Sequence, residues 1–281
     1  MRLSRKQIIA IILKKKNAIL GLLDMPRVPG MGIHQVTSEA GIRRFLRAYL
    51  KTAPVDSIKH NPYSGADPSW IVKLKGGQTA LFKPDRAWGE AVAAGVDQIM
   101  GFNRVPVVVT RTVNDRPGVL MQWSKSSPTW FKKHNTFGPA FAPETPEAFH
   151  EMRMFDYVIG NADRHGGNFL LPAHGKQSIV PIDQANSLSS GFGYYASAFF
   201  ASPAQNFDRS LRALTTASRK RLVSKLDRVV RSENKLKQIY GSNSGMMPVA
   251  PHPLADSLIE EMVVRAKYLK RRIVSEELDN Q

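Results

Sequence analysis

Cysteine is absent from this 281-residue chain, and no apolar run approaches the length needed to cross a membrane. Without cysteine, disulfides and thiolate metal sites are excluded, and nothing indicates an oxidising compartment. The basic start, residues 1–6, precedes a short apolar run from Ile8 to Leu13, which lysines 14–16 end. A secretory signal needs a longer apolar stretch and a small-residue cleavage site. We therefore expect a cytoplasmic protein without a transmembrane segment.

Acidic residues are also scarce, because 23 Asp and Glu stand against 40 Lys and Arg, which gives a formal net charge of +17. The basic excess gathers in residues 1–51 and 208–240. Such a surface attracts phosphates, nucleic acid, an anionic membrane or an acidic protein. A basic surface that serves solubility alone is the alternative. Charge by itself therefore does not identify a partner.

The hydrophobic pattern along the chain changes from helical to extended and back to helical. Helical spacing predicts basic helices at 4–23 and from Thr37 or Ser38 to about Lys51, within an N-terminal extension over residues 1–53. Residues 54–69 are rich in Pro, Gly, Ser and Asp and are interpreted as a loop. Strands and one helix follow at 70–74, 79–83, 88–101, 105–113 and 118–123, with turns at Gly76-Gly77 and at Asp115-Arg-Pro-Gly.

Beyond a proline-rich loop the chain is mostly helical. Helices are expected at 146–160, 208–216, 217–232 and 254–274, and short paired strands at 169–171 and 179–182. The pattern predicts an α+β fold with two lobes. Residues 54–123 form a small β-rich N-lobe with one helix, and residues 124–281 form a mostly helical C-lobe.

The strongest local signal is the polar run from Asp156 to Asn168, followed by a second apolar strand that ends in Ile182-Asp183. Phosphoryl transfer requires a carboxylate that orients the attacking hydroxyl, and metal ligands that hold Mg²⁺ on the phosphates. Asp163, in the loop after a helix, is the candidate catalytic residue. Asn168 and Asp183 are hard oxygen ligands at the ends of adjacent strands, which suits Mg²⁺. A polar turn that caps a helix is the alternative interpretation.

A second signal is Ala80-Leu-Phe-Lys83. A lysine at a strand edge can reach the α- and β-phosphates if another group holds its side chain, and Glu90 in the next helix is positioned to do so. Asp97 is a competing carboxylate on the same helix. A strand lysine by itself usually faces solvent. The phosphate-binding role of Lys83 is therefore inferred from its position before the aspartate motif.

Three weaker candidates remain. Met121 and Trp123 end a strand between the lobes and could hold adenine through backbone groups and apolar surface, although a plain core strand explains them equally well. His165 could touch the γ-phosphate or orient Asp163, and a structural role in its loop is the alternative.

These residues resemble the Golgi casein-kinase family, the secretory protein and glycan kinases. Three segments look like that family's lysine strand, glutamate helix and catalytic loop: Gly76 to Pro84, Glu90 to Pro106, and Phe155 to His165. The similarity spans roughly residues 70–275. It implies an atypical two-lobed kinase fold and a requirement for ATP with Mg²⁺ or Mn²⁺. By motif it assigns Lys83 to the phosphates, Glu90 to its ion pair, Asp163 to catalysis and Asp183 to the metal.

The chain also departs from that family. It lacks a signal peptide and cysteines, so a secretory setting does not transfer. Asn168 makes the loop Asp-Arg-His-x-x-Asn, which is similar to the phosphoinositide 3- and 4-kinases and to the HipA-type kinases. Gln184-Ala185 stands after Asp183, where Asn-Gly would be expected. A bacterial or viral relative is the best interpretation.

The sequence thus predicts an ATP-dependent kinase whose acceptor is Ser or Thr of a protein. A lipid headgroup, a sugar or another small molecule is the alternative acceptor, and the basic segments leave contact with an anionic membrane open. A non-catalytic nucleic-acid-binding protein on a kinase-like scaffold is a further alternative, which predicts salt-dependent binding without ATP turnover.

Overall fold

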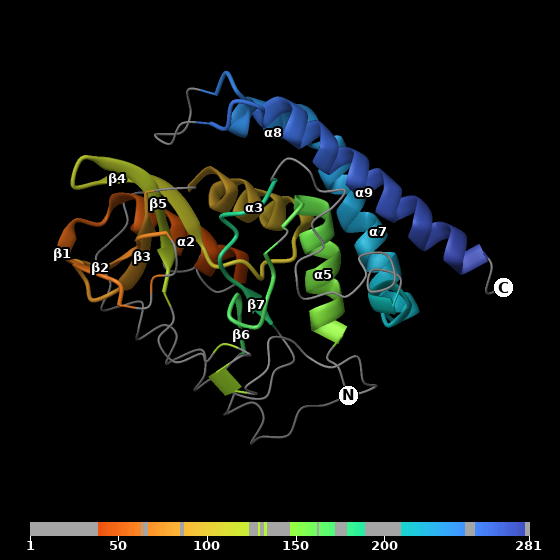
Figure 1. Ribbon diagram of the computed structural model, residues 1–281, viewed down its shortest axis with the longest axis horizontal. Helices are drawn as coiled ribbons and strands as arrows, with labels where there is room; N and C mark the ends of the chain where they lie inside the picture. Colours follow the sequence, from red (N-terminus) through yellow and green to blue (C-terminus); the bar gives the residue numbers. More distant parts are fainter. Residues whose placement is uncertain are drawn as a thin grey trace.

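The computed structural model of the chain is shown in Figure 1, with the sheet on one side of the molecule and most of the helices on the other. The residues that it describes are 39–62, 64, 67–84, 87–123, 129, 132–133, 147–161, 163–171, 179–188, 209–244 and 251–278. The helix expected at 4–23 and most of the proline-rich loop after residue 123 lie outside these ranges.

A five-stranded antiparallel sheet has the strand order β1-β2-β3-β5-β4. Its strands are β1 (Val55–His60), β2 (Trp70–Leu74), β3 (Thr79–Lys83), β4 (Val108–Val113) and β5 (Arg116–Gln122). Gly76 and Gly77 connect β2 to β3 with φ angles of 101° and 87°, which glycine adopts without steric cost. The tight glycine turn predicted there is confirmed.

Two details of the sheet differ from the prediction. Residues 54–69 contain the edge strand β1, which was missed because most of its side chains are exposed and it shows no buried apolar alternation. The β4–β5 turn is Asn114-Asp115, with φ angles of 49° and 60° that these two residue types tolerate. The predicted turn at 115–118 is therefore misplaced, because Arg116 and Pro117 already pair with β4.

One helix covers each face of the sheet. Helix α2 (Glu39–Thr52), which the sequence analysis assigns to the N-terminal extension, shares a core with Ala80 and Phe82 of β3. Helix α3 (Ala87–Met100) packs with Leu81 on the other face. Because side chains alternate along a strand, Lys83 lies on the same face as Leu81. The sheet therefore directs Lys83 toward α3.

The longer helices that follow the sheet in the described residues are α5 (Glu147–Ile159), α7 (Thr216–Arg231), α8 (Glu233–Tyr240) and α9 (Ala255–Leu278). Thr215 caps the N-terminus of helix α7, because its side chain accepts a hydrogen bond from the backbone N–H of Ser218. Helix α8 was not predicted, because it is short and buries only Leu236 among its residues. None of the helices in the described residues is long and apolar enough to cross a membrane.

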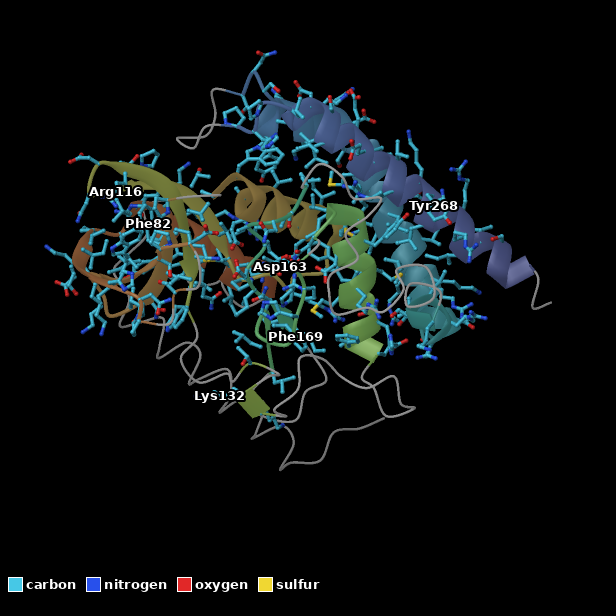
Figure 2. The ribbon with its side chains drawn as sticks, viewed as in Figure 1. Phe82, Arg116, Lys132, Asp163, Phe169 and Tyr268 are labelled. Carbon is cyan, nitrogen blue, oxygen red and sulfur yellow. The ribbon has the colours of Figure 1, made fainter. Side chains whose placement is uncertain are left out.

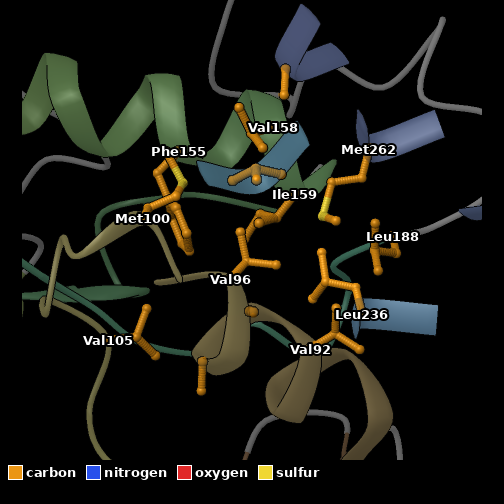
Figure 3. Packing of buried hydrophobic residues seen from close by; sticks show 14 of the residues in the cluster. Val92, Val96, Met100, Val105, Phe155, Val158, Ile159, Leu188, Leu236 and Met262 are labelled. Atoms are coloured by element: carbon orange, nitrogen blue, oxygen red, sulfur yellow. The ribbon is translucent and has the colours of Figure 1, made fainter. Parts of the chain in front are cut away.

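The main core joins α3 to the helices that follow the sheet. Figure 3 shows Val92 and Val96 of α3 in one cluster with Val158 and Ile159 of α5 and Met262 of α9. Each such fully buried side chain contributes about 1.5–3 kcal/mol to stability. This continuous core fixes α3, and hence Glu90, against the helical part of the molecule.

A two-stranded antiparallel sheet, β6 (Phe169–Leu170) with β7 (Val180–Pro181), lies below α3 and beside α5 in Figure 1. Both strands were predicted as a pair. Because they run antiparallel, the start of β6 and the end of β7 lie at the same end of the pair. Asn168 and Asp183 come directly before β6 and shortly after β7, so the fold brings these two residues to one place.

Candidate active site

The lysine at the end of β3 lies between two carboxylates. Lys83 Nζ is 2.7 Å from Glu90 Oε1 and 2.7 Å from Asp183 Oδ1. Glu90 stands in the first turn of α3 and is fully buried. The ion pair expected between Lys83 and Glu90 is therefore present, and the structure adds Asp183 as a second partner.

Electrostatics keep Lys83 in its charged form. Burial alone would lower the pKa of the ammonium, but the charges of Glu90 and Asp183 and their hydrogen bonds outweigh burial and raise the pKa above its usual value. An ammonium has three donors, and two of them are used by these carboxylates. One donor of Lys83 remains for another anionic group.

Asp97, the competing carboxylate on α3, has different partners. Its Oδ1 accepts hydrogen bonds from the backbone N–H groups of Arg104 and Val105, at 3.0 and 3.3 Å. Its Oδ2 lies 3.4 Å from Arg43 Nη2 of helix α2. Asp97 therefore stabilises the turn after α3, and Glu90 is the residue of this helix that meets Lys83.

The loop after α5 presents Asp163 as an exposed carboxylate. Its backbone N–H donates to Asn161 Oδ1 at 3.0 Å, and its Oδ2 accepts a hydrogen bond from Asn186 Nδ2 at 3.1 Å. In the view of Figure 2, Asp163 lies between the five-stranded sheet and α5. A carboxylate held by one oxygen can offer the other to a hydroxyl group, which is the geometry a general base or orienting group requires.

Asn168 and Asp183 carry side-chain oxygens of the kind that bind Mg²⁺, and the fold places the two residues next to each other. The side-chain N–H of Asn168 donates to the backbone oxygen of Asp163 at 2.7 Å, which leaves its Oδ1 as the free end of the amide. The backbone N–H of Ile182 donates to the Asn168 oxygen at 3.0 Å, so Asp183 follows directly beside Asn168. One amide and one carboxylate oxygen fit Mg²⁺, which takes few side-chain ligands and completes its shell with phosphate and water. The described residues hold no group of three or more His, Asp or Glu that could bind a metal by themselves.

Arg164 holds this site together, and sequence analysis gave it no role. Its buried guanidinium forms a two-point ion pair with Asp156 of α5, with Nε–Oδ2 and Nη2–Oδ1 distances of 2.9 Å each. The same group donates to Gln184 Oε1 and to the backbone oxygens of Asn168 and Ile182. One side chain therefore fixes the backbone on which both metal-ligand candidates stand. Its position between Asp163 and His165 was the available signal, but its partners depend on the fold.

Gly89 links the lysine–glutamate pair to the segment that carries Asp183. A Cβ at Gly89 would lie 2.6 Å from the backbone oxygen of Ala185 and 3.0 Å from that of Gln184. Only glycine allows α3 to approach this closely. The contact explains how Asp183, far from Lys83 in the sequence, reaches its ammonium.

Comparison with known proteins agrees with this arrangement. The computed fold superposes on a crystal structure of a Golgi casein kinase with a TM-score of 0.58 and 14% sequence identity, covering 85% of this chain and 77% of that one. A Golgi casein kinase with Mn and ADP bound gives a TM-score of 0.58 at 13% identity, covering 84% and 76%. The chain has a kinase-like fold. The α+β architecture and the resemblance stated above are thereby confirmed.

A family match and one further structure add to this result. Residues 105–210, less than half of the chain, match the phosphatidylinositol 3- and 4-kinase family. This segment contains Asp163, Asn168 and Asp183 but not Lys83 or Glu90. A Helicobacter pylori proinflammatory kinase, CtkA, aligns with a TM-score of 0.48 and 16% identity, over 80% of this chain and 98% of that one. No curated protein matches the sequence. The family match and the fold together support a kinase.

The remaining predicted site residues are His165, Met121 and Trp123. His165 Nδ1 accepts a hydrogen bond from the backbone N–H of Gly167 at 3.0 Å, which holds the imidazole over its own loop. Met121 is buried in the main core, so its side chain has the structural role given as the alternative above, and any adenine contact would use its backbone. Trp123 packs against the same core, and its buried Nε1 has no hydrogen-bond partner among the described residues. The roles of all three toward a nucleotide stay predictions.

Proposed function

We propose that the protein is an ATP-dependent kinase that transfers the γ-phosphoryl group to Ser or Thr of a protein. The observation that carries the proposal is the contact of Lys83 with both Glu90 and Asp183 at 2.7 Å. This contact joins the two halves of a phosphate site that the sequence separates. The kinase-like fold and the name of the casein-kinase neighbours favour a protein acceptor.

Each residue has a definite task in this reaction. Glu90 holds Lys83, whose remaining donor binds the α- and β-phosphates. Asn168 and Asp183 would hold Mg²⁺ or Mn²⁺, which neutralises charge on the phosphates when bound. Asp163 orients the acceptor hydroxyl and takes its proton.

Three residues have supporting tasks in the same proposal. His165 orients Asp163 or contacts the γ-phosphate. The backbone at Met121 and the ring of Trp123 hold the adenine.

A lipid acceptor is the second candidate, because residues 105–210 match the phosphatidylinositol 3- and 4-kinase family. The test is transfer of label from γ-labelled ATP with Mg²⁺ or Mn²⁺, offered in parallel to a protein lysate and to vesicles that contain phosphatidylinositol. Label in protein that is recovered as phosphoserine or phosphothreonine after partial acid hydrolysis supports the first proposal. Label in the vesicles supports the second.

The matched variants for this test are Asp163→Asn and Asp115→Asn. Both remove one exposed carboxylate, but Asp115 lies in the β4–β5 turn, where Asn is well tolerated. Asp163→Asn should lower transfer by a factor on the order of 10² or more, and Asp115→Asn should not change it. Equal transfer by both variants would reject the role of Asp163. No transfer by the unmodified protein, together with salt-dependent nucleic-acid binding, would favour the non-catalytic alternative.

A further inference from the structure

Cations crowd around the turn that connects α3 to β4, away from Lys83. They come from α2, from the turn itself and from α7. We call this group the cationic cluster; its members are Arg43, Arg47, Arg104, Arg221, Lys225 and Arg228. The carboxylates that face it are Asp97 of α3, and Glu151 and Glu147 of α5. Positive charge is therefore in clear excess at this place.

The ion pairs of Asp97 and Glu151 involve only three of the six members of the cluster. Asp97 binds Arg43 and two backbone amides, as described above. Glu151 pairs with Arg104 and lies 3.9 Å from Arg221 Nη2. Arg43 also donates to the backbone oxygens of residues 103 and 105. These contacts are structural, and the same two carboxylates act on Arg47 and Lys225 only through longer-range attraction.

Three members of the cluster form no ion pair with a described residue. Arg47, Lys225 and Arg228 make no hydrogen bond or ion pair with the residues that the structure describes. Lys225 Nζ lies 3.8 Å from the centroid of the Phe102 ring, and Arg228 Nη1 lies 2.9 Å from where a Cβ on Gly101 would be. Both α7 cations therefore sit against the same turn.

Like charges act on one another within the cluster. Burial lowers the pKa of Lys225, and Arg104 and Arg221 lower it further, while Glu151 and Asp97 oppose these effects. Burial likewise lowers the pKa of Arg47, and the charge of Arg43 adds to the effect, while Tyr240 and Asp97 oppose it without reversing it. An anion bound among these cations would offset their mutual repulsion, because it attracts each of them.

We propose that the cationic cluster binds a compact anion that carries several phosphate groups. Guanidinium groups match phosphate oxygens in pairs, and Lys225 and Arg228 are three residues apart on one side of α7. Arg47 approaches from α2, so the site spans the sheet part and the helical part of the molecule. The proposal does not depend on the kinase activity, because none of these residues belongs to the Lys83 site.

A small anion suits the cluster better than a nucleic acid. The unpaired cations gather around one turn, between residues 97 and 105, and do not extend as a stripe along a surface. A polynucleotide gains affinity by many phosphate contacts spread along its backbone. Several phosphates on one small scaffold can instead reach α2 and α7 together.

The experiment uses inositol hexakisphosphate as the probe, titrated by calorimetry into the full chain at about 0.15 M salt. The test variant is Lys225→Gln/Arg228→Gln. The matched control is Lys267→Gln/Arg271→Gln, which removes the same two charges from exposed positions of α9. We expect one probe per chain, an affinity at least about tenfold weaker in the test variant, and little change in the control.

A second readout separates a site from a fold defect. Without the probe, the test variant should melt at the same temperature as the unmodified chain or higher, because it loses like-charge repulsion. The probe should raise the melting temperature of the unmodified chain and of the control only. If the test variant does not fold, Arg47→Gln, which leaves the Phe102 contact intact, must show the weakened affinity.

Three results would overturn the proposal. The first is no binding of the probe by the unmodified chain. The second is an equal loss of affinity in the test variant and the control, because that would indicate general attraction to a basic surface. The third is a duplex oligonucleotide that binds more tightly than the probe and loses affinity equally in both variants, because that would assign the basic surface to nucleic acid.

Discussion

The side-chain amide of Asn186 donates a hydrogen bond to Oδ2 of Asp163 across 3.1 Å. Asn186 stands three residues beyond Asp183, in the turn that returns the chain to the end of α5 through a hydrogen bond from Leu188 N to the Ile159 oxygen at 2.8 Å. The segment that offers a metal ligand therefore also positions the candidate catalytic carboxylate. The two functions are joined by one short stretch of chain.

Replacing Asn186 tests this link. Asn186→Ala should lower kcat by roughly tenfold and leave the KM for ATP unchanged, because it frees the orientation of Asp163 without touching the phosphate site. Asn186→Asp should be slower still, because it sets a like charge beside Asp163. Steady-state kinetics at varied ATP give the measurement. A rise in KM with unchanged kcat would show that Asn186 serves nucleotide binding instead.

The pair Lys83–Glu90 makes a second prediction. The two single variants, Lys83→Met and Glu90→Gln, should lose similar activity, because each breaks the same interaction. The double variant should lose about as much as either one, far less than the product of the two single losses. Asp97→Asn is the control on the same helix. Its partners are Arg43 and two backbone amides, so its effect should add independently to that of Lys83→Met. Independent effects of Lys83 and Glu90 would contradict the proposed role of the pair.

Sequence patterns were sufficient to predict contacts between residues that lie on the same element or on consecutive elements. Lys83 and Glu90 lie on consecutive elements, so strand alternation and the start of the next helix place them together. The departure at Gln184-Ala185 had no explanation in the sequence. The structure supplies one, because Gln184 is buried and its Oε1 accepts hydrogen bonds from Arg164 and Asn161.

Other features carried too weak a pattern to be predicted. Strand β1 was missed because an edge strand with exposed side chains lacks the apolar alternation on which strand prediction depends. The partners of Arg164 were beyond prediction for another reason. They come from α5, from Asn168 before β6 and from the segment after β7, and nothing in the local sequence specifies that these segments meet at one guanidinium.

Asp183 gives a third prediction, on metal binding. ATP with Mg²⁺ or Mn²⁺ should raise the melting temperature of the protein, because a ligand that binds only the folded state stabilises it. Asp183→Asn should remove the metal-dependent part of that rise. Asp115→Asn, which also replaces an exposed aspartate, should retain it in full. A metal-dependent rise that persists in Asp183→Asn would place the metal elsewhere.

The last prediction concerns Arg164, whose structural and positioning roles can be separated. Arg164→Met leaves the buried carboxylate of Asp156 without its partner, which should lower the free energy of unfolding by about 3–5 kcal/mol. Adding Asp156→Leu removes that unpaired charge, so the double variant should be clearly more stable than Arg164→Met, as denaturant unfolding would show.

Kinase activity should not recover together with stability in the double variant. The double variant still lacks the donor that holds the backbone oxygens of Asn168 and Ile182, next to both metal-ligand candidates. We therefore expect its activity to remain about as low as that of Arg164→Met, even though its stability is regained. Asp156→Leu alone keeps these backbone contacts and should retain more activity than either. Recovery of activity together with stability in the double variant would mean that Arg164 serves only to neutralise Asp156.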